Sequence, residues 1–313
     1  MEHLEAEARR LVTASMAKNS MATYHRGVAS FEAFRKELGI DNAWPATIAH
    51  IIAFISHMSI TGYASSTINT YVASITFVHK MNGWDDPSNN FVINKILEGC
   101  RRSNRQPDSR FPITIPILGQ LCVLLHSFCA SEFEAVLFKA TFLLAFFGFL
   151  RVGEFTAPSR KSDCSNILSR RDITMGDSVM SLVIRFSKTD QRGESTTLTI
   201  DQIDDAKLCP VKAMKDYLHI RPKERGPLFI HFGGAPVTRY QFNSMLKKGI
   251  SIMGLNPGDF SPHSFRIGAA TAAALGGVPI ESIKNMGRWK SSSVFLYIRP
   301  QRIIQSSAWS ISR

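Results

Sequence analysis

Two basic side chains that lie three positions apart in the sequence are the first candidates for a chemical role. His263 and Arg266 lie in the segment 261–266, which reads SPHSFR. Ser261 as the N-cap and Pro262 at the first helical position predict that a helix begins here, and the i,i+3 spacing places His263 and Arg266 on one face. The free backbone amides of a helix start suit a phosphate group. A solvated helix start fits the same pattern, so this pair alone does not decide between the two.

Three other segments carry further candidates, and each also has an ordinary structural interpretation. Arg151 precedes Glu154 by three residues after an apolar stretch, and Trp289 precedes Tyr297 by eight, with basic residues on both sides. An arginine at a helix end often only complements the helix dipole, and an isolated aromatic pair often packs in a core. Lys188 lies in a polar turn between two predicted strands, where a lysine often serves only solubility.

In chain order, six residues resemble the active-site series of the tyrosine recombinase (phage integrase) family: Arg151, Lys188, His263, Arg266, Trp289 and Tyr297. The stretch 263–299 is most similar to phage Cre recombinase and to eukaryotic mobile-element (Crypton-like) recombinases, with Trp289 about one residue closer to Tyr297 than in Cre. The resemblance implies a site-specific recombinase that acts on double-stranded DNA through a 3′-phosphotyrosyl intermediate. It also implies that Trp289 donates its indole N–H to the phosphate and that Glu154 orients neighbouring groups.

Elementary chemistry supports the same roles. Attack of a phenolate on a phosphodiester builds negative charge on the non-bridging oxygens, and the guanidinium groups of Arg151 and Arg266 with the imidazole of His263 suit that charge. The leaving 5′-oxygen needs a proton, and a lysine among other cations can have a lowered pKa. We therefore expect Lys188 to be the general acid.

Tyr297 is the expected nucleophile because it alone among the six tyrosines follows the His263–Arg266 segment. A covalent phosphotyrosine conserves the energy of the phosphodiester, so rejoining needs no ATP and no metal. The sequence has no P-loop and no clustered carboxylates or Cys/His ligands. We accordingly expect neither a cofactor nor a bound metal.

Composition and charge favour a globular protein with a polyanionic partner. The 313 residues carry 37 Lys and Arg against 25 Asp and Glu, a formal net charge of +12. Residues 1–110 hold 12 basic and 10 acidic side chains, and the remainder holds 25 and 15, so the excess lies in the C-terminal part. The five cysteines are an odd number without CxxC spacing, which is typical of reduced cysteines. The sequence also shows no signal peptide or membrane span, so we expect an intracellular protein, nuclear if the host is eukaryotic.

The first hundred residues show apolar spacing typical of helices. Residues 22–38, a segment after Pro45, a segment capped near Ser65, and a segment starting at Phe91 each carry this periodicity. The arginine-rich, apolar-poor stretch 101–110 has the composition of a linker. We assign residues 1–104 to a helical core-binding domain that contacts DNA, 105–115 to the linker and 116–313 to a catalytic domain.

The C-terminal part is expected to be mixed. Ser131 and Glu134 have capping-box spacing ahead of a buried helix that runs to about Gly148. Short β-prone segments at 172–175, 181–186 and 195–200 predict a small antiparallel sheet, and helices are expected over the ranges 210–219, 238–252, 262–275, 279–286 and 293–298. Small residues after Arg266 predict close packing of that helix. The predicted fold class is therefore mainly α with a small antiparallel β-sheet, in a two-domain recombinase architecture.

The resemblance implies a homo-oligomer that is a tetramer on DNA, with the two domains on opposite sides of the duplex, and no membrane association. Two other functions remain open at this stage. One is a domesticated DNA-binding protein that no longer cuts DNA, and the other is a type IB topoisomerase using the same chemistry. The sequence does not specify the target site, nor whether the reaction is integration, excision or transposition.

Overall fold

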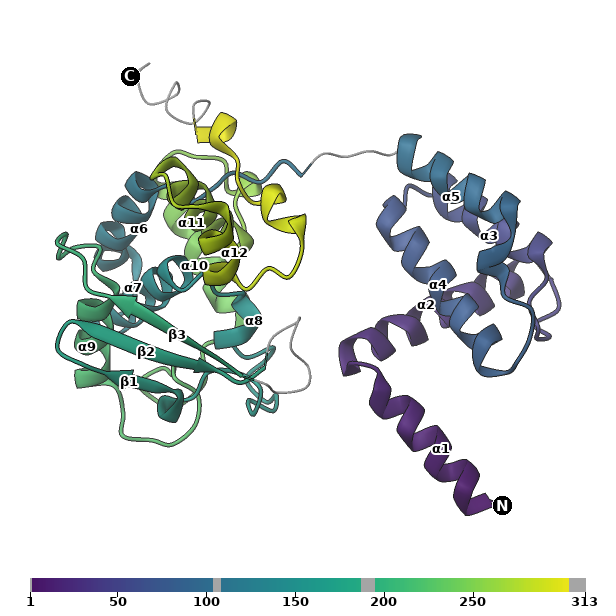
Figure 1. Cartoon of the computed structure of the whole chain (residues 1–313), viewed down its shortest axis with the longest axis horizontal. Helices are drawn as coiled ribbons and strands as arrows, with labels where there is room; N and C mark the ends of the chain where they lie inside the picture. The colour runs from purple at the N-terminus through teal and green to yellow at the C-terminus, as the bar shows by residue number, and fades with distance from the viewer. Residues whose placement is uncertain (1, 104–107, 187–194, 304–313) are drawn as a thin grey trace. The chain divides into compact units, whose positions relative to one another are not determined.

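The chain forms two compact units, Met1–Asp108 and Ser109–Arg313, in a computed structural model that describes residues 2–103, 108–186 and 195–303. Figure 1 shows helices in both units and a sheet in the second alone. The expected fold class, mainly α with a small antiparallel sheet, is confirmed. None of the helices in the described ranges combines the length and hydrophobicity that crossing a bilayer requires.

Over its described residues, the first unit contains helices and no strands. Its elements are α1 (Glu2–Ser15), α2 (Lys18–Glu37), α3 (Ile48–Ile60), α4 (Ser65–Met81), the 3-10 helix η1 (Pro87–Asn89) and α5 (Phe91–Ser103). Helices α2 and α4 pack together, and both α3 and α4 contact α5. Their inward faces form a core centred on the fully buried Phe31, Ile51 and Ile75.

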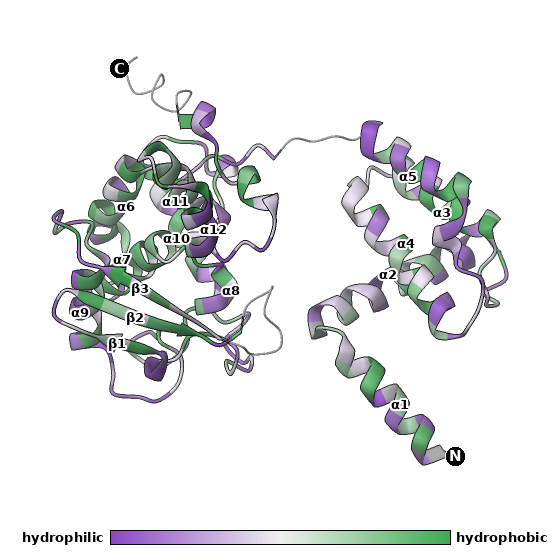
Figure 2. Ribbon diagram, in the orientation of Figure 1, coloured by the Kyte–Doolittle hydropathy of each residue, from purple (hydrophilic) through white to green (hydrophobic). Residues whose placement is uncertain are grey.

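Helix α5 illustrates how apolar spacing creates this core. Ile93, Leu97 and Cys100 recur every three to four residues and are buried. Figure 2 shows the result as alternating green and purple bands along the helix. Helix α5 ends at Ser103.

The second unit is built around one helix that is apolar on nearly every side. The unit contains α6 (Ile115–Phe128), α7 (Glu132–Phe147), α8 (Val152–Phe155), β1 (Ile173–Met175), β2 (Val179–Ile184), β3 (Thr196–Asp201), α9 (Pro210–Ile220), α10 (Arg239–Ile252), α11 (His263–Leu275) and α12 (Ile280–Gly287), with 3-10 helices η2 (Arg170–Asp172), η3 (Pro257–Asp259) and η4 (Ser292–Leu296). Helix α7 contacts α6, α9 and α11. Such all-round contact requires an apolar helix, because every face is removed from water.

The sheet has the order β1-β2-β3 and is antiparallel throughout. The side chains of Met180, Leu182 and Ile184 on the central strand are buried and alternate with partly exposed neighbours. Leu182 faces Ile173 on one side and Leu198 on the other. This alternation places one face of the sheet on the core.

Some predicted boundaries were wrong, and three α-helices, α1, α6 and α8, were not predicted. The central strand covers 179–184 rather than 181–186, and the segment near 293–298 is the 3-10 helix η4 rather than an α-helix. Helix α8 has only four residues, too few to show a helical period. The apolar stretch Ile115–Phe128 has no strong polar face to reveal a helical period.

Close packing of α11 is confirmed at one glycine. A Cβ built on Gly268 would lie 1.9 Å from the carbonyl oxygen of Ile113, a distance that no side chain tolerates. The backbone N–H of Ile113 also donates to Ser264 O at 3.0 Å. The chain that enters the second unit is therefore laid directly against the helix that carries His263 and Arg266.

Candidate active site

Arg266 lies at the centre of the candidate site. It extends from the first turn of α11, and its side chain is fully buried. Its Nη1 donates to the carbonyl of Phe149, in the segment that follows α7, and its Nη2 donates to the carbonyl of Gly287, at the end of α12. One guanidinium group thereby connects three elements that are distant in sequence.

Aromatic rings surround the same guanidinium group. Its Cζ lies 4.1 Å from the centroid of the Trp289 ring and 5.5 Å from that of Tyr297. The rings of Trp289 and Tyr297 meet edge to face with centroids 4.8 Å apart. Because an aromatic face attracts a cation, these rings help to hold Arg266 in place.

A tight chain reversal after α12 makes this packing possible. Gly287 ends the helix, and a Cβ at that position would lie 1.7 Å from the Trp289 ring. Arg288 follows with a φ of 55° in the left-handed region, which is uncommon for a residue with a side chain. The reversal directs Trp289 back under its own helix end, where it is only 7% exposed.

Tyr297 is held against α11 through its backbone. The Oγ1 of Thr271 donates to Tyr297 O at 3.0 Å and accepts from the N–H of Arg299 at 3.0 Å. The Tyr297 ring is partly buried and lies 4.7 Å from the His263 ring, centroid to centroid. The Tyr297 phenol therefore lies beside the His263 imidazole and the Arg266 guanidinium group. These two groups share one face of α11, as their i,i+3 spacing predicts.

Arg151 and Glu154 flank this centre from the short helix α8. Arg151 is the N-cap residue, and its backbone N–H donates to Glu154 Oε2 at 2.9 Å. Its Nη1 also pairs with Glu154 Oε1 at 3.1 Å. The Glu154 carboxylate is buried and accepts a second guanidinium group, since Arg288 Nη2 lies 2.6 Å from Oε2.

Positive charge exceeds negative charge in this cluster. Burial, followed by repulsion from Arg151 and Arg288, lowers the pKa of Arg266 to about 9, against attraction by Glu154. Burial also lowers the pKa of Arg288, with Glu154 opposing the change. One carboxylate among three guanidinium groups leaves an environment that favours an additional anion.

Several buried donors in the cluster have no acceptor among the described residues. They are Arg266 Nε, Arg288 Nε, Arg288 Nη1 and the indole Nε1 of Trp289. Buried N–H groups are nearly always hydrogen-bonded in folded proteins, because an unpaired one costs about 1–3 kcal/mol. Unsatisfied donors beside excess positive charge are typical of a site that binds an anion.

The structure brings together five of the six residues proposed from the sequence. They come from the N-cap of α8 (Arg151), the first turn of α11 (His263 and Arg266), the segment between α12 and η4 (Trp289) and the end of η4 (Tyr297). Lys188 lies outside the described residues. Arg288 was missed by the sequence analysis, which treated it only as a basic neighbour of Trp289, and no periodicity distinguishes it because it lies in a chain reversal.

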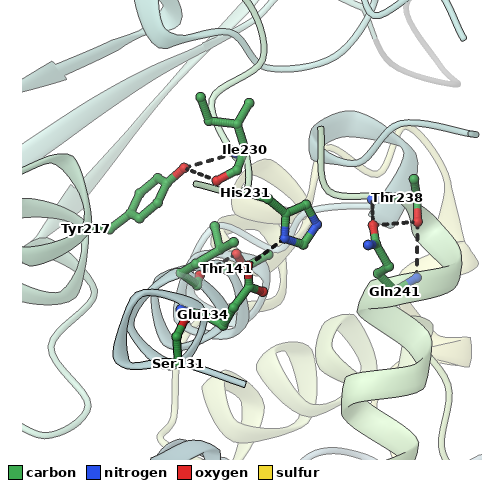
Figure 3. A network of polar contacts seen from close by, with 9 residues as sticks. Ser131, Glu134, Thr141, Tyr217, Ile230, His231, Thr238 and Gln241 are labelled. Atoms are coloured by element: carbon green, nitrogen blue, oxygen red, sulfur yellow. Dashed lines mark hydrogen bonds and ion pairs between the residues drawn. The ribbon is translucent and has the colours of Figure 1, made fainter. Parts of the chain in front are cut away.

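Two predicted caps differ from those in the structure. Helix α11 begins at His263, and the Ser261 hydroxyl has no hydrogen-bond partner within residues 2–103, 108–186 and 195–303. Instead, the Ser264 Oγ accepts from the Ser261 N–H at 3.0 Å. The Ser131 hydroxyl accepts from Glu134 N at 3.3 Å as expected, but the Glu134 carboxylate contacts His231 Nδ1 at 2.7 Å rather than completing a capping box. Figure 3 shows that Glu134 points toward His231.

Comparison with known proteins places the chain in a family. Residues 125–301 match the phage integrase family, and residues 10–82 match the phage integrase N-terminal SAM-like domain. The chain thus belongs to the phage integrase family, the tyrosine recombinases, and is an enzyme of DNA strand transfer. It is 25% identical over 323 residues to an integrase/recombinase XerD homologue of Selenomonas ruminantium, with 98% of this chain and 89% of that protein covered.

Solved structures with a similar fold include three DNA complexes. XerH recombinase bound to a palindromic difH substrate has a TM-score of 0.64 at 14% identity, covering 92% of this chain and 79% of XerH. The Tn1549 transposon integrase with transposon right-end DNA has a TM-score of 0.64 at 14% identity, covering 97% of each chain. A lambda integrase dimer bound to a COC′ core site has a TM-score of 0.63 at 14% identity, covering 95% of this chain and 76% of the lambda integrase chain. At these identities the likeness establishes the fold.

Proposed function

We propose that this protein is a site-specific DNA recombinase that cleaves and rejoins double-stranded DNA through a 3′-phosphotyrosyl intermediate at Tyr297. The observation that carries the proposal is the position of the Tyr297 ring, which packs on His263, Arg266 and Trp289 beside a cluster with excess positive charge. A phenol in such surroundings is suited to attack a phosphodiester. The family to which the chain belongs supports the same chemistry.

In the proposed reaction, the Tyr297 phenol loses its proton to solvent, and its oxygen forms a bond to phosphorus while the bond from phosphorus to the 5′-oxygen breaks. Arg151, His263 and Arg266 stabilise the charge on the non-bridging oxygens, and the unpartnered Trp289 Nε1 supplies a further donor. Lys188 gives the departing 5′-oxygen its proton. One phosphoester replaces another, so the reverse reaction rejoins the strand without ATP.

We further propose that the protein assembles as a tetramer on its DNA. The XerH, Tn1549 integrase and lambda integrase structures were determined with DNA, and the lambda integrase structure contains a dimer. The net charge of +12 supports a polyanionic partner. Sedimentation of the protein with and without a cognate duplex measures the assembly state.

The proposal is tested with a nicked suicide duplex taken from the DNA that flanks the gene. We expect the wild-type protein to form a covalent adduct that resists denaturant, and the Tyr297→Phe variant to form none. Tyr63→Phe serves as the matched control, because Tyr63 lies in the first unit and is 41% exposed. We expect this variant to form the adduct. An adduct with Tyr297→Phe, or none with the wild type on any flanking site, contradicts the proposal.

A second measurement separates a recombinase from a topoisomerase. A recombinase exchanges strands between two cognate sites and needs those sites for any cleavage. A type IB topoisomerase relaxes supercoiled plasmids that contain none of them. We expect exchange between paired sites and no relaxation of a plasmid that lacks them.

A further inference from the structure

Arg288 has an unusual setting for an arginine at the end of a helix. Residues there are ordinarily solvent-exposed and complement the helix dipole. The Arg288 side chain is only 7% exposed, and the residue has a φ of 55°. A left-handed conformation is unfavourable for a residue with a Cβ, and burial of a charge adds to that cost.

A single carboxylate accounts for the burial of this side chain. Arg288 Nη2 donates to Glu154 Oε2 at 2.6 Å, whereas its Nε and Nη1 are buried with no hydrogen-bond partner in the described part of the chain. An arginine that served stability alone would be expected to use more of its five donors. Among the described residues, the Arg288 side chain thus has Glu154 as its one hydrogen-bond acceptor.

Glu154 in turn holds Arg151 through two contacts. The Glu154 carboxylate accepts from the Arg151 backbone N–H at 2.9 Å and from its Nη1 at 3.1 Å. Oε2 receives both the Arg151 N–H and Arg288 Nη2, while Oε1 receives Arg151 Nη1. Rotation of the carboxylate would therefore break the Arg288 contact on Oε2 in addition to the two Arg151 contacts. Arg151 is thus oriented by a carboxylate that Arg288 helps to hold in place.

The charge balance of the cluster adds a second effect. Without Arg288, Glu154 would neutralise a larger share of the charge on Arg151 and Arg266. With Arg288 present, the carboxylate is shared among three cations, as its attraction for both Arg266 and Arg288 indicates. More positive charge is thereby left for an incoming phosphate.

We propose that Arg288 is a positioning residue that acts through Glu154 to fix the Arg151 guanidinium group for the scissile phosphate. The inference rests on the proposed function, because it assigns Arg288 a role in that same site. Arg288 need not contact DNA in this proposal. Its effect is on the rate of strand cleavage rather than on the affinity for DNA.

The test uses the full-length protein with saturating suicide duplex and measures single-turnover cleavage per folded molecule. We expect Arg288→Gln to slow cleavage by about 10- to 100-fold, the usual effect of losing a residue that orients a catalytic group, with DNA affinity within about threefold of the wild type. Arg288→Lys keeps the cation next to Glu154 and should recover part of the rate. Lys290→Gln, an exposed cation two residues away, is the matched control and leaves cleavage at saturation unchanged.

A double-mutant cycle shows whether the effect passes through Glu154. If it does, adding Arg288→Gln to Glu154→Gln causes no further loss of rate. Wild-type-like cleavage by Arg288→Gln, or equal losses with and without Glu154, would overturn the proposal. A loss that disappears when rates are corrected for the folded fraction would overturn it as well. Failure of the wild type to form an adduct would instead contradict the proposed function, so the two failures are distinguishable.

Discussion

Among the described residues, each unit contains one completely buried arginine, and the two arginines make contacts of the same kinds. Arg35 in the first unit donates to the carbonyls of Ala43 and Asn42, and its Cζ lies 4.5 Å from the Phe31 ring and 5.2 Å from the Trp44 ring. Arg266 in the second unit likewise donates to two carbonyls and stacks on two rings. In both, the Nε atom is buried and has no hydrogen-bond partner in the part of the chain that the structure describes.

The charges around the two arginines differ in sign. Burial lowers the pKa of Arg35, but Glu32 and Asp41 act against this change. Burial and two cations, Arg151 and Arg288, lower the pKa of Arg266, with Glu154 alone among the carboxylates acting against them. The charge of Arg35 is thus compensated by its own unit, whereas that of Arg266 is not.

The comparison teaches that a buried arginine by itself does not indicate a functional site. Carbonyl contacts and aromatic stacking are compatible with a purely structural role, as at Arg35. What distinguishes the candidate site is a buried cation surrounded by further cations. Such an arrangement destabilises the free protein and is favourable only when an anion binds.

The largest expected effect separates the two arginines by activity. Arg266→Lys loses the second carbonyl contact and the planar donor geometry. We expect single-turnover cleavage of the suicide duplex to fall by about 10²- to 10³-fold, the usual cost of losing one donor to a developing oxyanion. Arg35→Lys, the matched control, should cleave at the wild-type rate per folded molecule. Equal losses in both variants would contradict the comparison.

The second prediction concerns the stability of the DNA-free protein, to which Arg35 should contribute more than Arg266. Arg35→Leu removes a compensated cation, two carbonyl contacts and two ring contacts, and should lower the free energy of unfolding by about 2–4 kcal/mol. Arg266→Leu relieves repulsion as well as losing contacts, so its cost in DNA-free protein should be smaller. Urea unfolding followed by tryptophan fluorescence gives both values. A larger cost for Arg266→Leu would remove the distinction drawn here.

A third prediction follows from the uncompensated charge. Phosphate should stabilise the wild-type protein by binding the cluster, and at ten times its Kd the gain is about 1.4 kcal/mol. We expect the melting temperature to rise with phosphate at constant ionic strength, with chloride as the balancing salt. The rise should be lost in Arg266→Leu and kept in Arg35→Leu. An equal response from both variants would assign the binding to another surface.

The smallest expected effect concerns a charge pair that resembles Arg35 in being compensated. His231 Nδ1 lies 2.7 Å from Glu134 Oε1 (Figure 3), and this contact raises the pKa of His231. A raised pKa means that the pair contributes fully below the unfolded value of about 6.5 and loses its contribution as pH rises through the higher folded value. Glu134→Gln should therefore cost up to about 1 kcal/mol at pH 6 and less at pH 9, measured by urea unfolding. A cost that does not change with pH would exclude a charged His231.

The sequence was sufficient to predict features that depend on local spacing. The helical periods of the first unit, the short β-prone segments and the pairing of His263 with Arg266 on one helix face all follow from repeats of two or three to four residues. The order of six residue types along the chain was sufficient to indicate the family. The boundaries of the elements were predicted less accurately. The central strand, for example, begins and ends two residues earlier than predicted.

Other features required the tertiary structure, because they depend on residues that are distant along the chain. The contact of Arg288 with Glu154 spans 134 residues and arises only when α12 ends beside α8. The contact of Glu134 with His231 spans 97 residues and replaces the local cap that the spacing predicted.

The sequence by itself thus determined which residue types are available for phosphoryl transfer and on which helix face His263 and Arg266 lie, since both follow from local geometry. Only the tertiary structure decided that the charge of Arg266 is uncompensated while that of Arg35 is compensated. The sum of charges around a buried group depends on through-space distances, which no local pattern records.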